Sequence, residues 1–204
     1  MMGTSMGDDA EKIVETLKKN AYRKEYLPIQ GLPPLRDAIP KYLEKKTGNN
    51  YPKENILITP GSKEAMLLMH IAFNGEILIP APGWVSYEPQ AQIGSNKVHW
   101  LETSRSNNWF PTANELEKKI KKIGKKKNLI FILNSPNNPS GAVSNNLKEL
   151  AKVAKKYKLI ILSDEIYTDL TFENYYDSIS SHYPELTFIT GGLSKWCGAG
   201  GWRL

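Results

Sequence analysis

The sequence has little of several features that define other classes of protein. It has one cysteine, Cys197, so no disulfide can form within the chain, and a reducing compartment such as the cytoplasm is expected. Its longest apolar runs, such as Leu129–Leu133, are as long as a strand and too short to span a bilayer. The first nine residues lack the basic flank and apolar stretch of a signal peptide, so we expect an unstructured leader over residues 1–9.

Histidine is scarce as well. The three histidines, His70, His99 and His182, lie far apart in the sequence and have no metal-ligand spacing. We interpret them as structural or surface residues and expect no metal site.

The charge of the chain is unbalanced, with a net charge of +6. Much of the excess lies in residues 118–127, a lysine-rich run that resembles a nucleic-acid or membrane patch. Leu116, Ile120 and Ile123 fall at helical spacing, however, so these lysines are predicted to form the solvent face of an amphipathic helix. No aromatic residues interleave with them, and we therefore expect neither a nucleic-acid nor a membrane partner.

Segments with strand and helix patterns alternate along the chain. Two amphipathic helices are predicted first, over residues 10–21 and 35–47, the second ended by Gly48. The predicted strands cover residues 55–59, 76–80, 97–102, 128–134, 159–163 and 186–190. The predicted helices between them cover residues 63–73, 112–123 and 145–157.

This alternation predicts an α/β fold, a three-layer αβα sandwich with a mainly parallel sheet. Continuously apolar strands agree with it, because strands of a parallel sheet are buried on both faces. The helix over residues 63–73 is apolar almost all round and is predicted to be buried, and Ser144 is a candidate cap for the last helix.

Polar and glycine-rich motifs follow the predicted strands, where open α/β sheets bind ligands. Gly61-Ser62-Lys63 follows the strand over residues 55–59 and opens a helix, so its backbone N–H groups and hydroxyl are a candidate anion site. A plain strand–turn–helix with a serine cap explains the same residues equally well.

Ser194-Lys195 carries little weight as a pair, since most such pairs lie on protein surfaces. Here it follows an apolar strand and precedes a glycine-rich turn and Arg203. A lysine amine can form a Schiff base with the aldehyde of pyridoxal phosphate, and arginine offers strong, fixed donors for a phosphate. This context favours a lysine that holds such a cofactor.

Three further motifs suit a flat, charged cofactor. Trp84, on a loop past a strand, can stack on an aromatic ring, although a tryptophan at the edge of the core explains it too. Asp164 ends a strand and can face a ring nitrogen, with Tyr167 near the ring hydroxyl; a helix cap is the alternative for Asp164. The run Asn134–Gly141 has more prolines and asparagines than a turn needs, and we predict a cis Asn138–Pro139 bond.

Taken in order, these motifs resemble those of the class I/II aminotransferases, which are fold-type I pyridoxal-phosphate-dependent enzymes. The matching segments are Tyr26–Gly31, Pro60–Ala65, Trp84, Asn134–Gly141, Asp164–Tyr167 and Ser194–Arg203. The resemblance covers residues 10–204 and implies the large cofactor-binding domain of such an enzyme, in part. The implied cofactor is pyridoxal 5'-phosphate, and the implied reaction moves an amino group between an amino acid and a 2-oxo acid.

The resemblance also implies roles for residues around the cofactor ring. Lys195 would form the Schiff base and move the substrate proton. Asp164 would pair with the ring nitrogen, and Tyr167 and Asn138 would contact the ring oxygen. Trp84 would stack on the ring.

A second group of residues is implied to bind the cofactor phosphate, namely Ser62, Lys63 and Arg203, with Ser194 assisting. Tyr26 is similar to a family residue that reaches the phosphate of the neighbouring subunit, which implies a homodimer with shared sites. Gly192 stands where some relatives carry a phosphate-binding serine, so one contact is expected to be lost.

Members of this family are about twice as long as this chain. The N-terminal segment that closes over the substrate, the last strand of the large domain and the C-terminal small domain are therefore expected to lie outside the 204 residues. Two alternatives stay open at this point. One is another reaction on the same cofactor, such as a β-lyase or racemase reaction, and the other is a truncated, non-catalytic fragment that binds a partner.

Overall fold

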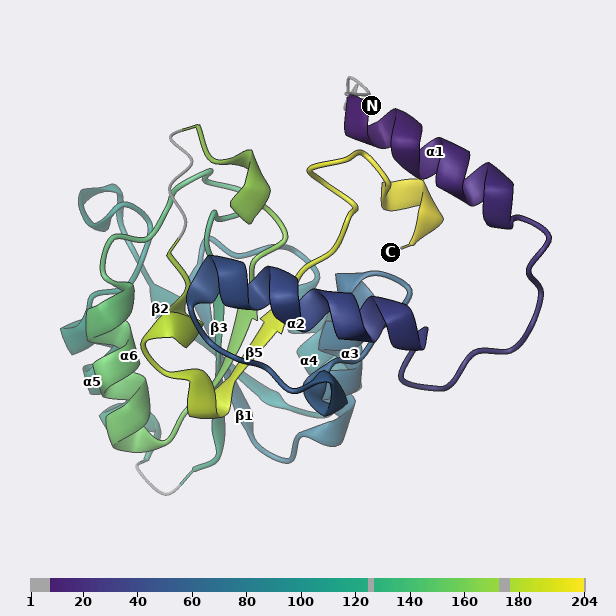
Figure 1. Cartoon of the computed structure of the whole chain (residues 1–204). Coiled ribbons are helices and arrows are strands. Elements are labelled where there is room, and N and C mark those ends of the chain that lie inside the picture. The colour runs from purple at the N-terminus through teal and green to yellow at the C-terminus, as the bar shows by residue number, and fades with distance from the viewer. Residues whose placement is uncertain (1–7, 125–126, 173–176, 204) are drawn as a thin grey trace.

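The computed structural model describes residues 8–124, 127–172 and 177–203. A five-stranded sheet lies at its centre, with the strand order β2-β1-β3-β4-β5 (Figure 1). The strands are β1 (Glu76–Ala81), β2 (Lys97–Glu102), β3 (Leu129–Asn134), β4 (Ile160–Asp164) and β5 (Thr187–Thr190). The helices are α1 (Asp8–Asn20), α2 (Pro33–Thr47), α3 (Ser62–Ala72), α4 (Tyr87–Ile93), α5 (Ala113–Ile123) and α6 (Leu147–Tyr157). Every strand pair is parallel, which confirms the predicted α/β class.

Helices cover the sheet on both faces. Successive strand residues point to opposite faces, so each buried strand contributes side chains to two apolar clusters. On one face, Ile130 and Ile132 of β3 belong to a cluster that includes Met66 of α3. On the other face, Phe131 lies in a cluster with Leu150 of α6. Figure 1 shows α5 and α6 on one side of the sheet and α3 and α4 on the other, so the three-layer sandwich is confirmed.

Within α5, Lys118, Lys121 and Lys122 of the lysine-rich run are exposed, as predicted for the solvent face of this helix. Thr112 caps this helix with a capping box: its hydroxyl accepts from the Glu115 N–H at 3.2 Å, and its own N–H donates to the Glu115 carboxylate at 2.8 Å. Leu116 and Ile120 are fully buried against the sheet, while the last turn carries Lys121 and Lys122. The amphipathic pattern therefore serves packing.

The predicted strand over residues 55–59 is wrong. Residues Lys53–Asn55 form a 3-10 turn, and the chain then runs extended outside the sheet. The Ile58 N–H donates to the Gln30 carbonyl at 3.0 Å, and Leu57 is half exposed. Residues 55–59 have the apolar composition of a strand, but their backbone bonds to the segment before α2 and to no described strand of the sheet.

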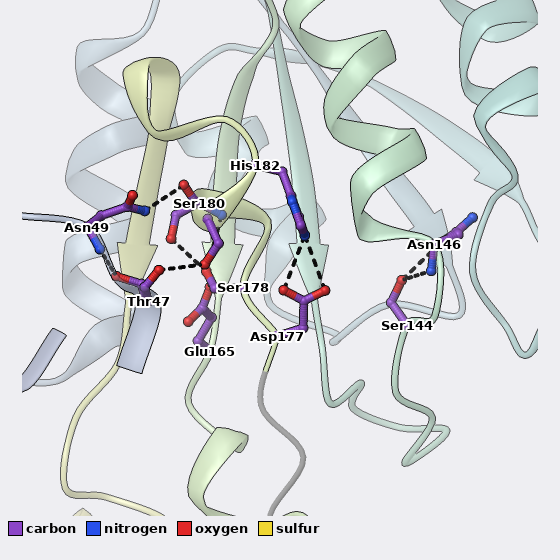
Figure 2. Close-up of polar contacts among 10 residues, drawn as sticks. Thr47, Asn49, Ser144, Asn146, Glu165, Asp177, Ser178, Ser180 and His182 are labelled. Atoms are coloured by element: carbon purple, nitrogen blue, oxygen red, sulfur yellow. Dashed lines mark hydrogen bonds and ion pairs between the residues drawn. The ribbon is translucent and has the colours of Figure 1, made fainter. Parts of the chain in front are cut away.

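Two predictions about helices also need correction, and one helix was missed. Helix α3 is not buried all round, because Leu68 and Ile71 are 43% and 56% exposed. The residue that caps α6 is Asn146, and Ser144 instead donates its hydroxyl to the Asn146 side chain at 2.9 Å (Figure 2). Helix α4 was not predicted, because its two turns follow a proline- and glycine-rich loop and have little helical periodicity beyond Tyr87 and Ala91.

The N-terminal helix stands apart from the sheet and its covering helices (Figure 1). An unstructured leader was expected over residues 1–9. Residues 1–7 lie outside the described residues, whereas residues 8 and 9 belong to α1, which begins at Asp8. Leu17 of its apolar stripe is 50% exposed. None of the helices in the described ranges is both long and apolar enough to cross a membrane.

The centre of the sheet should be the most sensitive part of the fold. Phe131 on β3 is fully buried, so Phe131→Ala should lower the free energy of unfolding by about 3–5 kcal/mol. Phe188 on the edge strand β5 is 51% exposed, and Phe188→Ala should cost roughly 1 kcal/mol or less. Urea unfolding followed by circular dichroism measures both, and equal losses would contradict the described core.

Candidate active site

The site begins with the register of three neighbouring strands. Asn134 at the end of β3 pairs with Asp164 at the end of β4, which pairs with Thr190 at the end of β5. Because the strands are parallel, these residues and the loops after them meet at one edge of the sheet. A cavity of about 350 Å³ opens there.

Nine of the ten predicted site residues line this cavity. They are Ser62, Lys63, Trp84, Asn138, Asp164, Tyr167, Ser194, Lys195 and Arg203. They come from five separate stretches of the chain, so their convergence is a property of the fold. Their chemical roles stay predictions.

Asp164 is the most deeply buried charged group of the cavity, with 3% of its surface exposed. Its Oδ2 accepts from the Tyr87 hydroxyl at 2.7 Å, and its Oδ1 accepts from the Thr190 hydroxyl at 3.3 Å. Burial raises the pKa of Asp164, while these hydrogen bonds, one from the Ile166 N–H and the charge of Lys195 act to lower it. The site thus holds a buried carboxylate at the wall of an open cavity.

Asn134 connects the loop after β3 with the end of β4. Its Oδ1 accepts from the Asn138 N–H at 2.7 Å, and its Nδ2 donates to the Asp164 carbonyl at 2.9 Å. Asn138 in turn donates from Nδ2 to the Tyr167 hydroxyl at 3.3 Å. The predicted cis Asn138–Pro139 bond is confirmed.

The N-terminus of α3 lies beside Arg203. Nη2 of this arginine donates to the Pro60 carbonyl at 3.3 Å, and Nη1 donates to the Gly200 carbonyl at 2.7 Å. Gly61 has a φ of 83°, and a Cβ there would lie 3.0 Å from the guanidinium carbon and closer still to Nη2. The glycine therefore leaves the space that the guanidinium occupies. The guanidinium and the N-terminus of α3 at Ser62 together form a cationic corner of the cavity.

Two lysines and two aromatic rings also line the cavity. The Lys63 Nζ lies 5.4 Å from the centre of the Trp84 ring, and the Lys195 Nζ lies 5.6 Å from the centre of the Tyr167 ring. Both amines lie within cation–π range of these rings. Lys195 is exposed, which leaves its amine accessible from the cavity.

Tyr26 is the predicted site residue that the fold does not bring to this cavity. It is fully exposed in the segment between α1 and α2, where Leu27 and Ile29 are exposed as well. Gly192 lines a neighbouring cavity under α2. Neither Tyr26 nor Gly192 therefore lines the cavity at the carboxyl edge of the sheet.

Five cavity residues had no predicted role, namely Met66, Tyr87, Asn134, Ile166 and Gly200. Asn134 lies inside a recognised motif, but sequence spacing does not show that its side chain spans two loops. Tyr87 follows Trp84 by three residues. Because helix α4 was not predicted, the sequence did not indicate that both side chains line the same cavity.

The strand that carries Asp164 is fixed by a buried polar cluster on its far side. Glu165 accepts from the Ser163 hydroxyl at 2.8 Å and from the Ser178 hydroxyl at 2.6 Å, and Ser178 also contacts Ser180 (Figure 2). These bonds tie the end of β4 to the short helix Ile179–Ser181. Among the described residues, no group of histidine, cysteine, aspartate and glutamate side chains is arranged to hold a metal ion.

The fold and the cavity define an α/β protein with a cavity at the carboxyl edge of a parallel sheet. The sequence profile of the family described as "Aminotransferase class I and II" matches residues 4–204. This chain therefore belongs to the class I and II aminotransferase family, as its motifs predicted.

Individual relatives agree with this assignment. The chain is 34% identical to the aspartate aminotransferase of Pyrococcus horikoshii, over 96% of this chain and 51% of that protein. It is 33% identical to aromatic-amino-acid aminotransferase 2 of Thermococcus litoralis, over 96% and 52% of the two chains. A solved structure of a mutant aspartate aminotransferase from Thermus thermophilus matches with a TM-score of 0.88 and 26% identity, over 98% and 52% of the two chains. The chain thus spans about half the length of the curated relatives it matches.

The two asparagines of the site should respond differently to truncation. Asn134→Ala leaves the Asn138 N–H and the Asp164 carbonyl without their partner, and each such loss costs roughly 1–3 kcal/mol. The free energy of unfolding should therefore fall by at least about 2 kcal/mol. Asn138→Ala removes one long side-chain hydrogen bond and should cost less than about 1 kcal/mol. Urea unfolding measures the free energy of unfolding of both variants. Equal values would show that the Asn134 side chain does not stabilise the two segments that it joins.

Proposed function

We propose that this chain is part of the large domain of an aminotransferase, that it binds pyridoxal 5'-phosphate, and that the complete protein transfers an amino group from an amino acid to a 2-oxo acid. The observation that carries the proposal is that four suitable groups line one cavity, the one at the carboxyl edge of the sheet. The cavity presents a buried carboxylate, an accessible lysine amine, a flat indole and a cationic corner. Each of these matches one chemical group of the cofactor.

The ring side of the cavity fits a protonated pyridine. Asp164 is buried and ionisable, and no basic side chain in the described ranges forms a salt bridge with it. A pyridinium nitrogen would be a suitable partner for that carboxylate. Trp84 offers a flat surface for the ring, and the Asn138–Tyr167 pair offers donors for the ring oxygen.

The phosphate side fits as well. The N-terminus of α3 at Ser62 supplies backbone N–H groups and a hydroxyl, and Arg203 supplies a guanidinium next to them. Lys63 and Ser194 line the same cavity and are proposed to assist. Because the ammonium of Lys63 lies over Trp84, its backbone N–H is the better candidate for the phosphate.

When bound, the cofactor supplies an electron sink that stabilises negative charge at the substrate Cα. Lys195 would hold the cofactor through its aldehyde and would carry the Cα proton, because its amine is accessible from the cavity and lies near Tyr167. Asp164 would keep the ring nitrogen protonated. Tyr167 and Asn138 would orient the ring through its oxygen.

We further propose a homodimer. The support is the exposed segment around Tyr26, in which three large side chains, Tyr26, Leu27 and Ile29, are 105%, 58% and 92% exposed. In a dimer Tyr26 would reach the phosphate corner of the partner subunit. The single cysteine, Cys197, supports a reducing compartment, and we propose the cytoplasm.

The substrates are proposed as a class only. The relatives are named for aspartate and for aromatic amino acids, and these substrates differ in charge and size. An amino acid donor and a 2-oxo acid acceptor are common to both, and the reaction belongs to amino acid metabolism.

The reaction can be tested with the complete protein that contains this chain. Supplied with a ¹⁵N-labelled amino acid, pyridoxal phosphate and an unlabelled 2-oxo acid, it should move the label to the new amino acid. Lys195→Ala should abolish both this transfer and the visible absorption of the lysine-bound cofactor. Mass spectrometry and absorption spectroscopy measure the two effects.

Lys63→Ala is the matched control, because it removes the other lysine of the cavity and should keep the absorption at saturating cofactor. Release of free ammonia, or inversion at Cα without transfer of label, would instead support a lyase or racemase. Unchanged absorption in Lys195→Ala would refute the lysine assignment.

The cationic corner can be tested through its glycine. Gly61→Ala should weaken cofactor binding by about tenfold or more, because the new Cβ displaces the Arg203 guanidinium. Gly48→Ala is the control: its φ of 73° imposes similar backbone strain, but the space around it is open and it ends α2 away from the cavity. Fluorescence titration with pyridoxal phosphate measures both dissociation constants, and equal effects would remove Arg203 from the phosphate site.

A further inference from the structure

We infer that Tyr87 is a positioning residue for the reaction proposed above, whose hydroxyl holds Asp164 ionised and fixes the carboxylate toward the cofactor ring nitrogen. The inference rests on the proposed cofactor. The new element is that a residue on the short helix α4 controls the protonation of the cofactor ring.

The geometry places the Tyr87 hydroxyl firmly against the carboxylate. Tyr87 is the first residue of α4, is 1% exposed, and donates to the Asp164 Oδ2 at 2.7 Å. Gln90, one turn later, donates from Nε2 to the Lys63 carbonyl at 2.8 Å and so anchors α4 to α3. The hydroxyl is therefore held in place by the packing of two helices.

Tyr87 provides the shortest hydrogen bond that Asp164 receives from a described side chain. Thr190 donates to the other oxygen at 3.3 Å, which is a long bond. Donation to a carboxylate stabilises the ionised form, and here it acts against burial, which raises the pKa of Asp164. Without the hydroxyl, the pKa of Asp164 would rise further, and the carboxyl would take up a proton at higher pH.

Tyr87 itself remains a donor throughout the working range of pH. Burial, together with the adjacent charge of Asp164, raises the pKa of its hydroxyl, so it stays protonated. The other titratable groups near this pair are Lys195, whose charge lowers the pKa of Asp164, and Tyr167, which acts on Tyr87. Both lie on the cavity side, where the cofactor would be.

The tyrosine also supports the stacking residue. Its ring lies edge-on to Trp84, with 5.5 Å between centroids and an interplanar angle of 82°. Tyr87→Phe keeps this ring contact and the buried volume and removes only the hydroxyl. The substitution therefore separates control of the carboxylate from packing.

The first test uses the complete protein without cofactor. Titration of ¹³C-labelled aspartate carboxyls by NMR should show the Asp164 midpoint of Tyr87→Phe raised by about one pH unit or more. Thr190→Val, which removes the longer bond, should raise it by less. An unchanged midpoint in Tyr87→Phe would overturn the inference whether or not the cofactor binds.

The second test uses the same protein with pyridoxal phosphate labelled with ¹⁵N in its ring. The ring nitrogen of the unmodified protein should be protonated at neutral pH, and in Tyr87→Phe it should lose its proton at a lower pH, with cofactor binding weakened about tenfold. Binding with an identical ¹⁵N titration in both proteins would overturn the inference alone. Failure of the unmodified protein to bind the cofactor would instead overturn the proposed function.

Discussion

The backbone hydrogen bonds that join β3 to β4 and β4 to β5 are parallel and in register, so Asn134, Asp164 and Thr190 lie side by side. The candidate site depends on this pairing. A parallel strand must return through a connection that crosses the sheet, so every strand delivers its following loop to the same edge. Nine predicted residues from distant parts of the chain meet there because the sheet has one direction.

The same arrangement makes a buried charge possible. Asp164 lies at the end of a strand whose other residues pack in the core, and its carboxylate is held by donors from α4, from β5 and from its own loop. Unpaired buried charge is unfavourable, and these donors offset only part of that cost. A cationic ring in the cavity would complete the pairing, which links the stability of this edge to occupation of the site.

Sequence periodicity was sufficient to predict the five strands, because each is a short apolar run between turn residues. It failed where the same composition has another role. The run at residues 55–59 is apolar but pairs with Gln30 outside the sheet, and α4 is too short to show a helical period. The motifs identified nine of the residues that line the cavity, whereas the contacts between the lining residues were not predictable. The Tyr87–Asp164 and Asn134–Asp164 hydrogen bonds join residues 77 and 30 positions apart, and only the packed fold determines which side chains meet at such separations.

The proposed function depends on one lysine that holds a cofactor in the cavity at the sheet edge. The most direct measurement is to incubate the protein with pyridoxal phosphate, reduce it with borohydride to make the lysine–cofactor bond permanent, and map the modified peptide by mass spectrometry. We expect a single pyridoxyl group, on Lys195. A cofactor fixed on Lys63 or spread over surface lysines, with Lys195 unmodified, would contradict it.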